Sequence, residues 1–176
     1  MTSPWTVQRT ARLVFVVLIL ACVIPLMIQR LGSEQGPLIK IVDTSGRVRE
    51  LSLADMKRLP ILTRLGSYQN QYGNWRDEGM YAGVYLKDIL GVDAYASVDV
   101  VAEDGYRVTV ERSRVEDLDY PMILALQMND VSVPEWEDGF RIAVLPESGR
   151  VSNADYGVES VGGYWVKRVV QLTLNP

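Results

Sequence analysis

The chain has 176 residues, and 48% of them are hydrophobic, which suits one globular domain with a short additional segment. It contains no histidine and a single cysteine, Cys22, which excludes a Ser-His-Asp triad, a Cys/His metal cluster and an intrachain disulfide. From Pro37 onward, fifteen basic residues face twenty-one acidic ones, and this negative charge disfavours a nucleic-acid partner.

The N-terminal residues 1–30 are predicted to be a membrane anchor. Arg9 and Arg12 precede sixteen uncharged residues, 13–28, and basic residues before an apolar stretch place the N-terminus in the cytoplasm. A cleaved signal peptide or a lipoprotein site at Cys22 are the alternatives, but the apolar run continues past Cys22. We therefore expect a single pass through a bacterial inner membrane, with the following domain in the periplasm.

Residues 31–37 are rich in Gly, Ser and Pro and are predicted to be a linker, so that the domain spans 38–176. The domain is expected to begin with strands at 38–42 and 48–51 around a turn at 43–46. Ser52, with Asp55 three residues later, is predicted to cap a short helix that Pro60 ends.

The next segment, 69–79, carries amides, aromatic residues and glycine without a hydrophobic period, and it is predicted to be a long loop. A short helix is expected after it, because Val84, Leu86, Ile89 and Leu90 form an apolar stripe and Gly91 suits a helix C-terminus.

The second half of the domain is predicted to be mainly strands. The Asp104–Gly105 dipeptide favours a hairpin between 97–102 and 106–111. Apolar runs at 122–126 and 140–145 are typical of buried strands, and 147–163 is predicted to be a second long loop. A last strand is expected at 164–174, with side chains that alternate between two faces. One predicted face carries Tyr164, Val166, Val170, Leu172 and Leu174. The other predicted face carries Trp165, Lys167, Gln171 and Thr173. These elements predict an α+β domain with a mainly antiparallel or mixed β-sheet and short helices.

No catalytic or metal-binding residue is predicted. Adjacent carboxylates occur at 77–78, 103–104, 116–117 and 137–138, and such pairs are usually solvated. The two predicted loops instead gather aromatic residues, amides and basic residues, which could stack on, hydrogen-bond and neutralise a flat polar ligand. The candidate ligand-binding residues are Asn70, Gln71, Tyr72, Asn74, Trp75, Arg76, Tyr81, Arg141, Tyr156, Trp165 and Lys167.

Several of these segments resemble the molybdopterin-binding domain of the sulfite-oxidase family. The similar segments, in order, are 70–75, 81–90, 104–106, 123–129, 139–146 and 164–168. The resemblance implies a mixed α+β fold in which the segments around Gln71, Arg141 and Trp165 border a pterin pocket. The family's molybdenum-ligating cysteine falls near Gln71, where this chain has none, and Glu159 and Gly162–Gly163 also depart from the pattern.

Some cysteine-less relatives of this fold act as pterin-binding regulators of signalling proteins. The resemblance therefore implies a non-catalytic protein that binds a pterin or molybdopterin-like ligand, without molybdenum, and acts with a membrane-bound signalling or enzyme partner. A molybdenum-cofactor-dependent oxidoreductase and a structural subunit of a membrane complex, with a filled pocket, are the alternatives.

Overall fold

The computed structural model describes residues 36–92 and 94–176. The predicted membrane anchor, and the linker up to residue 35, lie outside the described residues, and so does every expectation that depends on them. Among the residues that are described, no helix is long and apolar enough to cross a membrane. Residues Pro37–Pro176 form one compact unit, the domain.

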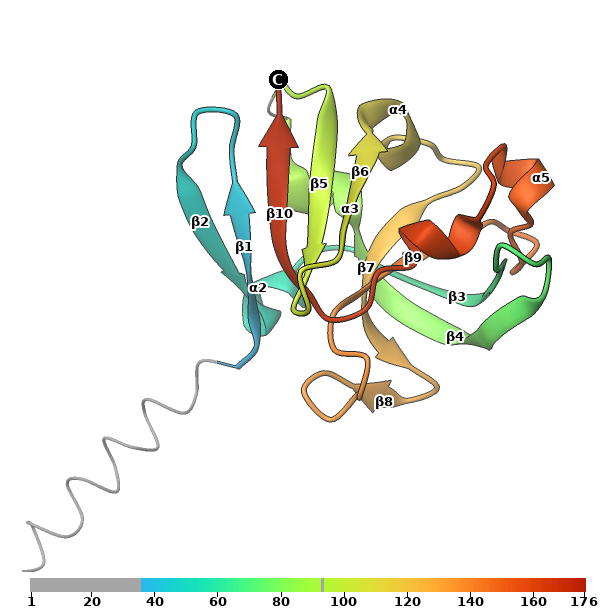
Figure 1. The fold of residues 1–176 in the computed structure, drawn as a ribbon. Coiled ribbons are helices and arrows are strands. Elements are labelled where there is room, and N and C mark those ends of the chain that lie inside the picture. Colours follow the sequence, from blue (N-terminus) through green and yellow to red (C-terminus); the bar gives the residue numbers. More distant parts are fainter. Residues whose placement is uncertain (1–35, 93) are drawn as a thin grey trace, which may run out of the picture. The chain divides into compact units, whose positions relative to one another are not determined.

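One sheet combines the beginning and the end of this domain (Figure 1). Its strand order is β2 (Val48–Ser52), β1 (Leu38–Val42), β10 (Val169–Asn175), β5 (Ser97–Ala102) and β6 (Arg107–Glu111). The β1–β10 pairing is parallel and the other pairings are antiparallel, so the sheet is mixed.

A second, antiparallel sheet is built from the middle of the chain. Its order is β3 (Ile61–Gln69), β4 (Trp75–Tyr85), β7 (Met122–Met128) and β8 (Val131–Ser132), and β9 (Arg141–Val144) also pairs with β7. Gly83 allows the close approach of β4 and β7, because a Cβ at this position would overlap the backbone of Leu124 and Ala125. Buried residues of both sheets form one hydrophobic core, among them Ile41, Leu172, Val84, Ile123 and Leu124.

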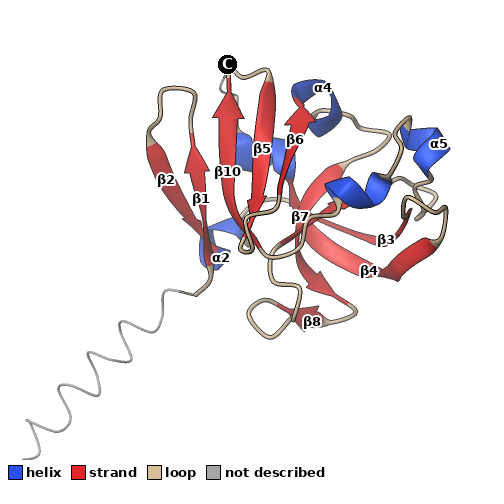
Figure 2. Ribbon diagram, viewed as in Figure 1, coloured by secondary structure: helices blue, strands red, loops and turns tan. Residues whose placement is uncertain are grey.

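The helices are short and connect the strands (Figure 2). They are α2 (Leu53–Met56), α3 (Leu86–Leu90), α4 (Arg112–Val115), α5 (Asn153–Tyr156) and the 3₁₀ helix η1 (Val161–Tyr164). The domain is therefore mostly β-sheet with a few short helices, which agrees with the predicted architecture.

The Ser52 cap and the hairpin at Asp104–Gly105, both predicted from the sequence, are confirmed by their hydrogen bonds. The Ser52 hydroxyl accepts a hydrogen bond from the Asp55 amide at 3.2 Å, and the Asp55 carboxylate accepts one from the Ser52 amide at 3.4 Å, which completes a capping box. The β5–β6 hairpin also forms: Gly105 has φ 87°, and the Asp104 carboxylate accepts a hydrogen bond from the Tyr106 amide.

The prediction of a long loop at 69–79 is wrong. Strands β3 and β4 form a hairpin, and only a tight turn separates Gln69 from Trp75. The side-chain oxygen of Asn70 accepts hydrogen bonds from the amides of Tyr72 and Asn74, so an Asn-based turn replaces the expected loop. The chain lacked a hydrophobic period here because this end of the hairpin is exposed on both faces. The expected helix is correspondingly shorter, and begins only at Leu86.

The last strand is also shorter than predicted. It begins at Val169 rather than at 164, because η1 precedes it and Arg168 adopts a φ of 50°. A register shift between Val169 and Gln171 turns Val170 outward, where it is 40% exposed, so the prediction that it shares a face with Leu172 and Leu174 is wrong. Leu172 and Leu174 are both buried. The predicted loop 147–163 contains α5 and part of η1.

Candidate functional site

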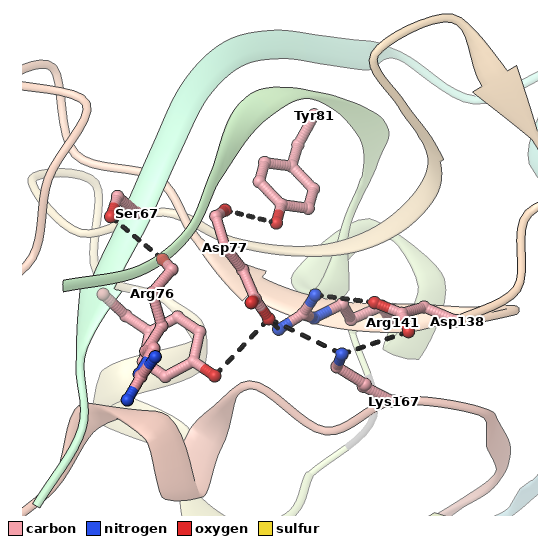
Figure 3. A network of polar contacts seen from close by, with 8 residues as sticks. Ser67, Arg76, Asp77, Tyr81, Asp138, Arg141 and Lys167 are labelled. Atoms are coloured by element: carbon pink, nitrogen blue, oxygen red, sulfur yellow. Dashed lines mark hydrogen bonds and ion pairs between the residues drawn. The ribbon is translucent and has the colours of Figure 1, made fainter. Parts of the chain in front are cut away.

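The candidate site forms where β4 carries an irregularity beside β3. The pairing register shifts between Gly66 and Tyr68, and opposite this shift Asp77 has a φ of 51°. The Ser67 hydroxyl donates a hydrogen bond to the carbonyl oxygen of Arg76 at 2.9 Å and holds the irregular segment in place. Figure 3 shows the result: the Asp77 carboxylate points toward Arg141 instead of following the strand.

Arg141, the first residue of β9, is fully buried and holds the centre of this site. Its Nη2 lies 2.5 Å from Oδ2 of Asp77, and its Nη1 lies 2.8 Å from Oδ2 of Asp138. Lys167 Nζ completes the group, 3.1 Å from Asp138 and 3.6 Å from Asp77. Two cations therefore face two carboxylates, and the network has no net charge (Figure 3).

Three aromatic side chains enclose the guanidinium. Its Cζ lies 5.3 Å from the ring centre of Trp165 and 5.9 Å from those of Tyr68 and Tyr81. The rings also pack on one another: the Tyr68 and Trp165 centroids are 4.8 Å apart, and Tyr81 meets the edge of Trp165 at 5.3 Å. Cation–π attraction adds to the ion pairs in holding Arg141 at this position.

The ionisation of the site follows from these contacts. Burial disfavours the charged form of Asp77, but the hydrogen bond and the charge of Arg141 outweigh it, with a further contribution from Lys167, and the pKa of Asp77 is lowered. Burial raises the pKa of Tyr81, and the Tyr81 hydroxyl donates a hydrogen bond to the carbonyl oxygen of Asp77 at 2.7 Å. Burial also raises the pKa of Tyr68. The two tyrosines therefore stay neutral beside an ionised Asp77.

The structure brings together four of the residues proposed from the sequence: Tyr81, Arg141, Trp165 and Lys167. Trp165 is only 3% exposed, and its ring packs against the rings of Tyr68 and Tyr81. It therefore lies inside the domain rather than along an open cleft. Gly162 closes the opposite side, since a Cβ there would meet the Tyr68 ring at 2.8 Å.

The proposed residues of the hairpin tip lie at the surface instead. Five of them are exposed: Gln71, Tyr72, Asn74, Trp75 and Arg76. The sixth, Asn70, is partly buried, and its side chain accepts the hydrogen bonds of the turn. Trp75 packs against the guanidinium of Arg150, whose Cζ lies 5.5 Å from the ring centre. Arg150 also pairs with Glu78 at 2.6 Å.

Tyr156 belongs to a different cluster. Its ring contacts Tyr120 and Tyr164 at 5.7 and 5.4 Å, and Arg114 lies over it at 4.3 Å. Burial raises its pKa, which keeps the hydroxyl neutral.

From the sequence, Asp77 and Asp138 were expected to be solvated, and Tyr68 was only one of several aromatic residues near the hairpin, so the contacts of all three with Arg141 were missed. Asp138 precedes Arg141 by three residues, a spacing that could have indicated the pair. Asp77 is separated from Arg141 by 64 positions, and no local pattern in the sequence could have connected them.

These residues do not fit a molybdopterin that carries molybdenum. Such a cofactor is anionic and would require uncompensated positive charge, but Asp77 and Asp138 already neutralise Arg141 and Lys167. Gln71, at the position that resembles the family's cysteine, offers a carboxamide in place of a soft thiolate. Among the residues that the structure describes, no group of three or more Asp, Glu, Cys or His could hold a metal ion.

The fold is similar to that of a solved structure. The chain is similar to the crystal structure of the sulfane dehydrogenase SoxCD from Paracoccus pantotrophus, with a TM-score of 0.58 and 16% sequence identity. The match covers 80% of this chain and 38% of that one, so this chain spans well under half of its structural neighbour. No protein-family model and no curated protein matches the chain. At this identity the likeness concerns the fold alone, and it supports a distant molybdopterin-domain-like fold.

Proposed function

We propose that this domain is a non-catalytic member of a membrane assembly, in which a molybdopterin-type pocket has been filled by the protein's own side chains. The observation that carries the proposal is the double ion pair of buried Arg141 with Asp77 and Asp138. In this arrangement each of the two terminal nitrogens of the guanidinium is already paired with a carboxylate of the protein. The domain then acts through contacts with a protein partner, and the predicted anchor keeps it close to partners in the same membrane.

A metal-free pterin is the second candidate, and one observation favours it. Nε of Arg141 and Nε1 of Trp165 are buried donors without a hydrogen-bond partner within the described residues. Buried donors are normally paired, and pterin rings offer nitrogen and oxygen acceptors. The Tyr68 and Trp165 ring centres are 4.8 Å apart, so a pterin that stacked on this side of Trp165 would have to displace Tyr68.

Native mass spectrometry of the full chain, released from the membranes of its own host, separates these functions. The proposal expects the bare mass of the chain, together with a protein adduct after crosslinking in the cell. A chain that carries a pterin but no metal would favour the second candidate. One bound molybdenum per chain would contradict both.

A further inference from the structure

A groove of about 560 Å³ lies where the loop after β8 faces the first residues of β1 and β10. Its apolar lining includes Leu38, Val133, Pro134, Trp136, Phe140 and Val170. It adjoins a second, charged hollow of about 470 Å³, and both are bordered by Glu103, Glu137 and Arg168. We call these two adjoining hollows the depression, and its halves are the largely apolar groove and the mostly acidic hollow.

Backbone hydrogen bonds hold the walls of this depression together. The Val169 amide donates to the Phe140 carbonyl oxygen at 2.8 Å, and the Arg168 amide donates to that of Asp138 at 2.8 Å. The Glu103 amide in turn donates to the carbonyl oxygen of Arg168 at 2.9 Å. In Figure 1 the β5–β6 turn, the entry to β10 and the loop after β8 accordingly lie at the same end of the domain. Because the depression is already formed, a partner would not have to order it on binding.

The acidic half carries more negative than positive charge, with four acidic residues and two basic ones in its lining. Glu103, Asp104, Glu137 and Asp138 line it together with Lys167 and Arg168. Asp138 and Lys167 are engaged in the Arg141 network. The side chains of Glu103 and Glu137 make no hydrogen bond or ion pair within the described part of the chain. Two free carboxylates thus stand beside an apolar groove.

We propose that this depression binds an extended segment of a partner protein that presents Lys or Arg next to an apolar side chain. The apolar side chain would enter the groove beside Val170, and the cation would lie near Glu103 and Glu137. This inference rests on the proposed partner-binding function and adds the chemistry of the partner. The groove is also lined by Pro37, the first residue of the domain. The excess of carboxylates next to it favours a partner segment that carries basic residues.

Fluorescence anisotropy on the full chain in detergent tests this directly. The probes are two labelled ten-residue peptides, one alternating lysine with leucine and the other alternating glutamate with leucine. We expect the lysine peptide to bind more tightly, and the double variant Glu103→Gln/Glu137→Gln to weaken it about fivefold. Val170→Arg should weaken it as well, by adding bulk and positive charge at the groove. The matched control is Glu50→Gln/Glu159→Gln, which removes two exposed carboxylates elsewhere on the domain. Equal binding of the two peptides, or equal losses in the test and control variants, would overturn the proposal.

Photocrosslinking in the cell distinguishes failure of this inference from failure of the proposed function. A photoreactive residue is introduced at Val170 or, at the hairpin tip, at Tyr72. Adducts from Val170 that disappear in Glu103→Gln/Glu137→Gln support the groove. Adducts from Tyr72 alone overturn the groove and leave the partner-binding function standing, whereas adducts from neither position contradict both.

Discussion

Asp77 and Arg141, 64 positions apart in the chain, form an ion pair in which Nη2 lies 2.5 Å from Oδ2. The arginine side chain is fully buried and the aspartate side chain is 29% exposed, so the pair lies where the buried interior meets the surface. Removing one partner of a buried ion pair leaves the other charge uncompensated and lowers the stability of the fold. Substitution of Asp77 therefore tests how much this ion pair stabilises the domain.

Asp77→Asn should therefore destabilise the domain. We expect a loss of about 3 kcal/mol in the free energy of unfolding, at the low end for a buried pair because Asp138 still contacts Arg141. Urea unfolding followed by tryptophan fluorescence measures this loss. The matched control is Glu78→Gln, which breaks the exposed pair with Arg150 and should cost less than about 1 kcal/mol. Equal losses in the two variants would show that the Arg141 network does not hold the fold.

The same pair predicts how stability depends on pH. The pKa of Asp77 is lowered in the folded protein, so the folded state binds fewer protons than the unfolded state as the pH falls. The stabilisation is fully present above the unfolded pKa of about 3.9, and it is lost as the pH falls through the lower, folded pKa. Between about pH 5 and pH 2, the wild-type stability should fall more steeply than that of Asp77→Asn. Parallel pH profiles of the two proteins, measured by urea unfolding, would contradict this assignment.

The two candidate tryptophans should behave oppositely. Trp165 is buried against Tyr68 and Tyr81, so Trp165→Ala should destabilise the domain by about 3–5 kcal/mol. Trp75 is 42% exposed at the hairpin, so Trp75→Ala should change the free energy of unfolding by less than about 1 kcal/mol. Thermal unfolding followed by circular dichroism compares the two variants. A loss for Trp75→Ala as large as that for Trp165→Ala would contradict the placement of both side chains.

The sequence predicts those features of the domain that depend on residues close to one another in the chain. The Ser52 cap and the Asp104–Gly105 turn are set by residues within three positions of each other, and both were predictable. The β3–β4 hairpin was missed because Trp75–Arg76 and the tip are exposed on both faces, which removes the alternation that indicates a strand.

Some residues of the candidate site could be predicted from the sequence and others could not. Arg141 and Trp165 could be proposed from a resemblance between motifs. Their partners could not, because Asp77 reaches Arg141 only through the irregularity opposite Ser67 and its own positive φ. The same limit applies to Val170, which a bulge in β10 turns outward against the alternation of its neighbours.

Gln71→Cys tests whether the missing thiolate alone separates this domain from molybdenum binding. Gln71 lies in the exposed turn between β3 and β4, and a cysteine there would leave the charges around Arg141 unchanged. We therefore expect neither the wild type nor Gln71→Cys to hold stoichiometric molybdenum after expression in a host that makes molybdopterin. Elemental analysis of the purified full chain measures this, with Tyr72→Cys as the control for adventitious binding by an exposed thiol. About one molybdenum per chain in Gln71→Cys, and none in Tyr72→Cys, would mean that the thiolate was the decisive loss and that Asp77 and Asp138 can be displaced from Arg141.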